Sequence, residues 1–447
     1  MSSSATSRSG AGTPSPDVRT QTVVIGAGQA GLALSHWLRA AASPHVLLER
    51  GRVGERWRSE RWDSLVLLTP NRFNGLPGTP PHPERDGFID RRGVIAYLEA
   101  YAAGAPVREH TTVTRVVRAC DGFRVETDRG TWHAANVVIA TGDCDVPYVP
   151  AIADGVPADL HQLHASGYRR PGKLPPGGVL VVGAGPSGQQ LAAELRRAGR
   201  RVVLATGRHA RMPRRYRGRD VFSWLYATGQ LEAHAADVPD LGGARRAPSF
   251  PVSGAAGGQS LGLDRLAALG VEVTGRLRGF AGRHAVLAGD LSATAADADR
   301  RLRRVLGAID AYIARTGARA APPEPLHPLE PAPAPLLVPL DGFGTVLWAT
   351  GYRRAYPWLD VPVLDGDGEL LHHEGVTAVP GLYALGLRFQ RRRNSHFLGG
   401  VGCDAERLAA IITLTAPAPR SGPGAHAPGS GGRAARPPHG RRPRAPR

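Results

Sequence analysis

Residues 23–31 read Val-Val-Ile-Gly-Ala-Gly-Gln-Ala-Gly, and this stretch decides the fold. An apolar run that ends in Gly-x-Gly-x-x-Gly and continues into a helical pattern is typical of a strand, a tight turn and a helix that hold a dinucleotide. The first glycine suits the turn, the second lets a pyrophosphate approach the backbone, and the third lets the helix pack against its strand. Unpaired backbone N–H groups at the start of the helix can then donate hydrogen bonds to the phosphates. The residues expected to contact the cofactor are Gly26, Gly28, Gln29, Ala30 and Gly31.

The next apolar run, residues 46–48, ends in Glu49, followed by Arg50. A carboxylate at the tip of the second strand accepts hydrogen bonds from ribose hydroxyls. We therefore expect an adenosine without a 2′-phosphate at this first loop, with Glu49 and Arg50 beside it.

The same pattern returns at residues 179–188, which read Val-Leu-Val-Val-Gly-Ala-Gly-Pro-Ser-Gly. Its following strand, residues 202–205, leads to Arg208 where the first unit has Glu49. A guanidinium binds a 2′-phosphate through paired, charge-assisted hydrogen bonds, whereas a carboxylate repels it. The second loop is therefore predicted to hold NADPH through Gly183, Gly185, Ser187, Gly188 and Arg208, and Arg211, Arg214 or Arg215 could share the phosphate.

The charge of this 447-residue chain is +18, but its distribution argues against nucleic-acid binding. Residues 416–447 hold seven arginines and no acidic residue, in a Pro- and Gly-rich stretch that cannot form a core and is predicted to be a disordered tail. Residues 1–20 are polar and predicted to be disordered, without the apolar segment of a secretion signal. No apolar run is long enough to span a bilayer, so a cytoplasmic protein without membrane insertion is expected.

The three cysteines, Cys120, Cys144 and Cys403, are far apart and form no Cys-x-x-Cys pair. We therefore expect neither a redox dithiol nor a metal site.

The order of the motifs predicts an α/β fold with two Rossmann-like domains, the second inserted in the first. Two similar segments, Ala-Thr-Gly at Thr141 and again at Thr350, are predicted to be the connectors that cross between the domains. The predicted divisions are 21–150 for the first part of the first domain, 151–340 for the second, NADPH-binding domain and 341–415 for the second part of the first domain.

From about residue 22 to residue 415 the chain resembles the class B flavin-dependent monooxygenases and the bacterial flavoproteins often described as involved in potassium transport. The resemblance implies FAD at the first loop and NADPH at the second. It also implies that residues 54–58, 62–65 and 68–71 pass beside the flavin, and that residues 386–404 contact it from the C-terminal side. The residues this adds to the predicted cofactor site are Trp57, Asp63, Thr69, Gly386 and Asp404, and Asn71 is our candidate for a catalytic polar side chain.

The family implies a reaction in which NADPH reduces the flavin and a C4a-peroxyflavin then delivers oxygen to a small organic substrate. One departure concerns the linker fingerprint Phe-x-Gly-x-x-x-His-x-x-x-(Tyr/Trp/Phe). Here His164 and Tyr168 match, but Ala158 and Leu160 replace the aromatic residue and the glycine. An NADPH-dependent reductase or dehydrogenase without oxygen insertion therefore stays open, as does a redox-sensing regulator of a transporter. A homo-oligomer is compatible with the sequence.

Two arginine clusters have more than one explanation. Residues 208–226 hold more arginines than one 2′-phosphate needs, so some of these arginines could line a solvated rim or bind an acidic substrate. The resemblance also implies that residues 391–396, Arg-Arg-Arg-Asn-Ser-His, lie near the flavin, where a cation could stabilise a reduced flavin or steer a carboxylate.

Overall fold

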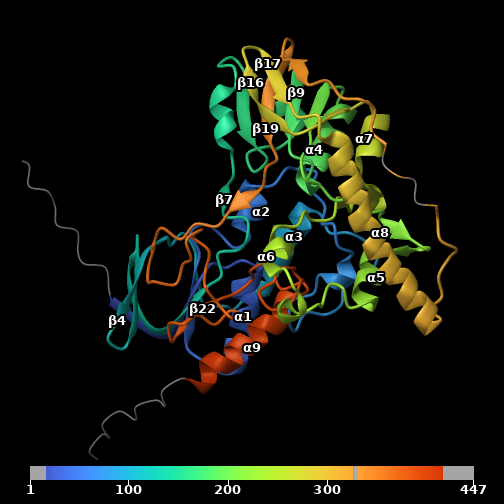
Figure 1. The fold of residues 1–447 in the computed structure, drawn as a ribbon. Helices are drawn as coiled ribbons and strands as arrows, with labels where there is room; N and C mark the ends of the chain where they lie inside the picture. The colour runs from blue at the N-terminus through green and yellow to red at the C-terminus, as the bar shows by residue number, and fades with distance from the viewer. Residues whose placement is uncertain (1–16, 326–327, 329, 416–447) are drawn as a thin grey trace, which may run out of the picture.

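A computed structural model describes residues 17–325, 328 and 330–415. Two parallel-stranded units, each with its own helices, form two lobes of the molecule, and the chain passes from the first to the second and back (Figure 1). This is the α/β arrangement of two Rossmann-like domains, with the second inserted in the first. The predicted tail, residues 416–447, lies outside the described residues.

The first sheet has eight strands. Parallel strands β22, β6, β1, β2 and β3 lie side by side, and β6 also continues into an antiparallel meander with β5 and β4, with β21 at the edge. Its strands are β1 (Asp17–Ile25), β2 (His45–Leu48), β3 (Val107–Arg108), β4 (Val113–Ala119), β5 (Gly122–Thr127), β6 (Gly130–Ile139), β21 (Leu359–Asp360) and β22 (Leu382–Ala384).

The second sheet is parallel throughout, in the order β15, β10, β9, β19, β8. A three-stranded antiparallel sheet, β16 to β18, belongs to the same lobe. The strands are β8 (His161–His164), β9 (Gly178–Val182), β10 (Val202–Ala205), β15 (Glu272–Thr274), β16 (Leu277–Ala281), β17 (His284–Leu287), β18 (Leu337–Pro339) and β19 (Phe343–Trp348).

The helices differ in what they support. Helices α1 and α4 follow the two glycine loops, α9 closes the first lobe, and the 26-residue α8 runs along one side of the molecule (Figure 1). Their bounds are α1 (Gln29–Ala40), α2 (Glu55–Ser59), α3 (Arg91–Ala102), α4 (Pro186–Arg197), α5 (Val221–Ala227), α6 (Leu241–Arg246), α7 (Leu263–Ala268), α8 (Leu291–Thr316) and α9 (Val401–Leu414).

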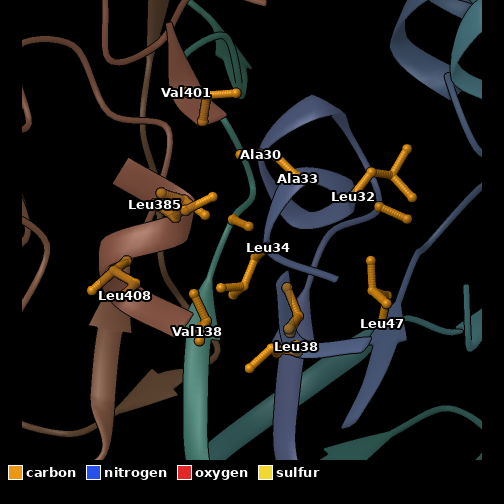
Figure 2. Packing of buried hydrophobic residues seen from close by; sticks show 14 of the residues in the cluster. Ala30, Leu32, Ala33, Leu34, Leu38, Leu47, Val138, Leu385, Val401 and Leu408 are labelled. Carbon is orange, nitrogen blue, oxygen red and sulfur yellow. The ribbon is translucent and has the colours of Figure 1, made fainter. Parts of the chain in front are cut away.

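The strand residues of the first sheet alternate between two cores because successive side chains point to opposite faces. Val24, Leu47 and Val138 pack on one face against α1 and α9, whereas Val23 and Val137 pack on the other. Figure 2 shows the first of these cores, in which Leu34 and Leu38 of α1 lie among the strand side chains and those of α9. Helix α9 comes from the end of the described chain, so this contact completes the first domain.

The two connectors pair directly with each other. Strand β7 (Val146–Pro147), just after Thr141, pairs antiparallel with β20 (Tyr352–Arg353), just after Thr350. Beside them, Nε2 of His164 donates a 3.0 Å bond to the carbonyl oxygen of Gly351, and the His164 ring packs edge-on against Tyr352, with ring centroids 5.1 Å apart.

Two predicted boundaries need correction. Residues 343–348 were assigned to the second part of the first domain, but β19 pairs with β9 and β8 inside the second sheet, so the chain returns only after residue 348. Residues 17–20, predicted to be disordered, begin β1, because the start of β6 extends far enough to pair with them. Residues 1–16 lie outside the described part of the chain.

Candidate functional site

The three glycines of the first loop have different surroundings. Gly26 has a φ of +105°, and a Cβ there would lie 2.7 Å from the carbonyl oxygen of Ala140. A Cβ on Gly31 would lie 2.0 Å from the carbonyl oxygen of Gly26, so the fold itself requires both glycines. Around Gly28, in contrast, the described chain has no atom within 4 Å of an added Cβ. The space in front of Gly28 is therefore open to a ligand.

The second loop repeats this geometry. Gly183 has a φ of +106°, with an added Cβ 2.6 Å from the carbonyl oxygen of Ala349, and an added Cβ on Gly188 would lie 1.8 Å from the oxygen of Gly183. Gly185 again faces open space, and the half-buried Ser187 stands in the first turn of α4. Each loop thus lies against the residue that precedes one connector threonine, Thr141 or Thr350.

Glu49 lies at the tip of β2, where the sequence predicts a ribose-binding carboxylate. Its Oε2 accepts a hydrogen bond of 2.9 Å from the backbone N–H of Ala27, and its Oε1 accepts one of 3.0 Å from Gly51. The carboxylate is therefore held beside the first glycine loop. A carboxylate oxygen has two lone pairs, so ribose hydroxyls can still donate to it.

Arg208 follows β10 and is exposed, with a long bond of 3.4 Å to the carbonyl oxygen of Arg246. The sequence leaves open which of the arginines after β10 bind the 2′-phosphate, and their partners in the structure distinguish them. Arg211 is paired with the buried Asp299 at 2.6 Å, and the buried Arg214 is paired with Asp220. Structural pairing accounts for these two, whereas Arg208 can turn toward a phosphate.

A second arginine stands at the same edge of the sheet. Arg276 follows β15, the strand next to β10, and its Nε lies 4.0 Å from the position of an added Cβ on Gly207. Its ion pair with Asp290 is long, at 3.7 Å, and its side chain is half exposed. Nothing in the sequence around residue 276 pointed to this position, because only the parallel pairing of β10 with β15 brings it beside Arg208.

The C-terminal segment, residues 386–404, lies over the first loop. An added Cβ on Gly386 would lie 2.7 Å from Cβ of Ala30, and Gln29 Nε2 donates a 2.8 Å bond to the carbonyl oxygen of His396. At the other end of the segment, an added Cβ on Gly399 would lie 2.0 Å from the oxygen of Phe73. The first glycine loop, residues 386–404 and the region around Asn71 therefore form one neighbourhood.

Asn71 is buried, and its amide is only partly satisfied. Nδ2 lies 3.0 Å from the carbonyl oxygen of Glu84 and 3.2 Å from Nδ1 of His82, whereas the buried Oδ1 has no hydrogen-bond partner among the described residues. Buried polar atoms are usually paired, so this oxygen is suited to a bond from a bound molecule. Close by, buried Thr69 donates its hydroxyl to Asn74.

Asp404 is buried in the first turn of α9, with Arg391 Nε 3.3 Å from its Oδ1. Burial raises the pKa of this carboxyl, and the Ser395 hydroxyl, Arg391 and Arg392 act in the opposite direction.

Three predicted site residues lie nearer to the connectors. Arg50 is 3.5 Å from Asp145, just before β7, and Trp57 of α2 lies 5.8 Å from the guanidinium of Arg61. Asp63 accepts a bond of 3.1 Å from Arg91, and its N–H donates to the carbonyl oxygen of Arg169. Of these contacts, the bond from Asp63 to Arg169 joins the first domain to the second. The role of the three residues toward FAD stays a prediction.

The comparisons with known proteins agree with this geometry. Residues 23–226 match the family of pyridine nucleotide-disulphide oxidoreductases. An uncharacterized CzcO-like oxidoreductase from Geobacillus kaustophilus is 32% identical over 391 residues, which cover 86% of this chain and 96% of that protein. The chain belongs to the CzcO-like oxidoreductases. It is thus an enzyme of the flavin-dependent oxidoreductase group.

Solved structures share its fold at low identity. A flavin-containing monooxygenase from Stenotrophomonas maltophilia has a TM-score of 0.61 at 21% identity, covering 89% of this chain and 99% of its own. A structure of OTEMO in complex with FAD and NADP has a TM-score of 0.52 at 16% identity, covering 88% of this chain and 85% of its own. At these identities the likeness shows a shared fold.

Within the described residues, no helix is long and apolar enough to cross a membrane, and no group of three or more His, Cys, Asp or Glu side chains is arranged to hold a metal ion. The three cysteines are free.

Proposed function

We propose that this protein is an NADPH-consuming flavin monooxygenase that acts on a small organic substrate with molecular oxygen. FAD occupies the first loop and NADPH the second. One contrast carries this assignment: both loops have an open central glycine, but Glu49 stands at the first strand tip and Arg208 at the second. Only the second tip suits a 2′-phosphate.

FAD, when bound, supplies hydride acceptance and the activation of oxygen. The residues of the chain hold and orient the cofactors and the substrate. Backbone N–H groups at the starts of α1 and α4 bind the two pyrophosphates, and Glu49 accepts hydrogen bonds from the ribose of FAD. Asn71 Oδ1 accepts a hydrogen bond from the flavin or the substrate, and residues 386–404 cover the flavin and restrict water. We place this activity in the cytoplasm.

The test is the reaction of the reduced, NADP⁺-bound protein with oxygen. A monooxygenase is expected to recover its flavin absorbance in two separate phases, with hydrogen peroxide released only in the slow one. Recovery in a single fast phase, with one hydrogen peroxide per NADPH, would instead establish a reductase or oxidase. A regulator of a transporter would oxidise NADPH slowly with every small molecule tried.

A further inference from the structure

Three arginines meet where the second domain touches the flavin-covering segment. Arg245 belongs to α6, and its Nη2 donates a 3.3 Å bond to the carbonyl oxygen of Phe389. In return, Arg388 Nη2 donates a 2.6 Å bond to the carbonyl oxygen of Ala247. Arg393 lies over the ring of Phe250, with its guanidinium carbon 5.1 Å from the ring centroid. The cluster is thus assembled from both domains.

The acidic groups of this region are already engaged. Asp143 and Glu369 both pair with a fourth arginine, Arg354, and Asp404 pairs with Arg391. In the described part of the chain, no carboxylate comes within 4.0 Å of the guanidinium groups of Arg245, Arg388 or Arg393. The cluster therefore carries an excess of positive charge.

This charge is also poorly solvated. All three side chains are only partly exposed, and burial lowers the pKa of each. The charge of Arg388 further lowers the pKa of Arg393, and that of Arg354 further lowers the pKa of Arg388, while Asp143 acts on Arg388 in the opposite direction. Holding guanidinium groups together away from water is unfavourable without an anion, so such an arrangement is expected where an anion binds.

The cluster adjoins the first glycine loop. The carbonyl oxygen of His396 accepts a bond from Gln29. The charges of the cluster arginines Arg388 and Arg393 act on the pKa of His396, as do those of Arg354 and Asp143. Its buried Nδ1 has no hydrogen-bond partner in the described chain. A bound anion at this position would lie beside the flavin rather than at a distant surface.

We infer that Arg388 and Arg393, with Arg245 beside them, bind the carboxylate group of an organic acid substrate next to the flavin. A planar guanidinium pairs with a carboxylate through two parallel hydrogen bonds, which gives orientation as well as affinity. The inference depends on the proposed function for the presence of a flavin at the first loop.

Titration of the purified, FAD-containing protein with benzoate tests the inference, with benzamide as its uncharged counterpart. Benzoate should shift the flavin absorbance and raise the melting temperature, whereas benzamide should do neither. Arg393→Met and Arg388→Met should each weaken benzoate binding by about tenfold or more, because the carboxylate then loses one partner of a desolvated pair. Arg246→Met is the matched control, since Arg246 is the exposed neighbour of Arg245 on the same helix, and it should bind benzoate as wild type does.

Other outcomes overturn the inference. If Arg393→Met lost FAD, or if its dissociation constant for NADPH rose, the anion would be a cofactor phosphate. An equal response to benzamide, or no response to benzoate, would show that the cluster does not select carboxylates. None of these results depends on oxygen chemistry, so reduction of the flavin by NADPH can succeed while this inference fails, and the two failures are distinguishable.

Discussion

At the scale of single residues, the two glycine loops show how far sequence reasoning reaches. The roles of Gly26, Gly31, Gly183 and Gly188 follow from the motif, and the structure gives the backbone oxygens that exclude a side chain at each. The arginines after β10 were harder to separate from sequence. Arg211 and Arg208 look alike in a sequence, and only the position of Asp299 on α8 shows which one is already paired.

The open space at Gly28 makes a sharp prediction. Gly28→Val should fold but lose FAD, because no chain atom lies within 4 Å of the new Cβ while the pyrophosphate must pass there. Flavin content and circular dichroism of the purified variant provide the measurement. Gly31→Val is the contrasting variant: a Cβ 2.0 Å from the Gly26 oxygen should prevent correct folding. Full FAD content in Gly28→Val would disprove the assignment of the first loop.

Coenzyme choice is predicted to depend on Arg208. Arg208→Ala should raise the KM for NADPH about tenfold, equivalent to about 1.4 kcal/mol, and leave that for NADH nearly unchanged. Arg276→Ala should raise the KM for NADPH less, because the carboxylate of Asp290 already pairs with part of the Arg276 charge. Binding of 2′,5′-ADP, compared with 5′-AMP, measures the same preference without turnover. A wild-type preference for NADH would refute the NADPH assignment. An unchanged preference for NADPH in the variant that combines Arg208→Ala with Arg276→Ala would refute it too.

At the scale of elements, the main error concerned β19. Residues 346–351 repeat the pattern of residues 137–142, a buried strand followed by Thr-Gly, so a sequence alone does not tell in which sheet the second copy lies. Pairing with β9 and β8 places it in the second sheet. The two connector threonines were found from the repeat itself, whereas the pairing of β7 with β20 needed the structure.

The contact between the connectors is expected to set how the two domains meet. The Thr350 hydroxyl donates to the carbonyl oxygen of Tyr148, so Thr350→Val removes a bond worth about 1 kcal/mol. We predict unchanged FAD content and a several-fold slower reduction of the flavin by NADPH, measured anaerobically by stopped flow. Thr316→Val removes a similar bond, to Tyr312 on α8, and should leave that rate unaltered. Equal rates in both variants would exclude a role for the connector bond.

At the scale of the whole molecule, the sequence predicted two domains and two cofactors but not what lies between the domains. The family resemblance predicts that residues 386–404 contact the flavin, and the positive charge of residues 391–396 is evident in the sequence. Arg245 was not predicted, because α6 is a short helix within the second domain's sequence and only the assembled fold brings it to Phe389. The candidate substrate site is therefore a property of the domain arrangement.

The same arrangement should make the protein sensitive to acid. Burial lowers the pKa of both His396 and His372 from 6.5 to about 4. At His396 the nearby arginines Arg388, Arg354 and Arg393 lower the pKa further, and Asp143 acts in the opposite direction. At His372 the positive charges of Arg245, Arg354 and His373 lower the pKa further. Between pH 6.5 and pH 4 the unfolded chain binds more protons than the folded one, so stability present above pH 6.5 is lost as the pH falls, by at most about 1.4 kcal/mol per pH unit for each histidine. His396→Asn should flatten the decline of melting temperature over this range, and adding His372→Asn should flatten it further. His161→Asn, at an exposed position, serves as the control. A decline equally steep in all variants would mean that neither histidine is kept neutral by the fold.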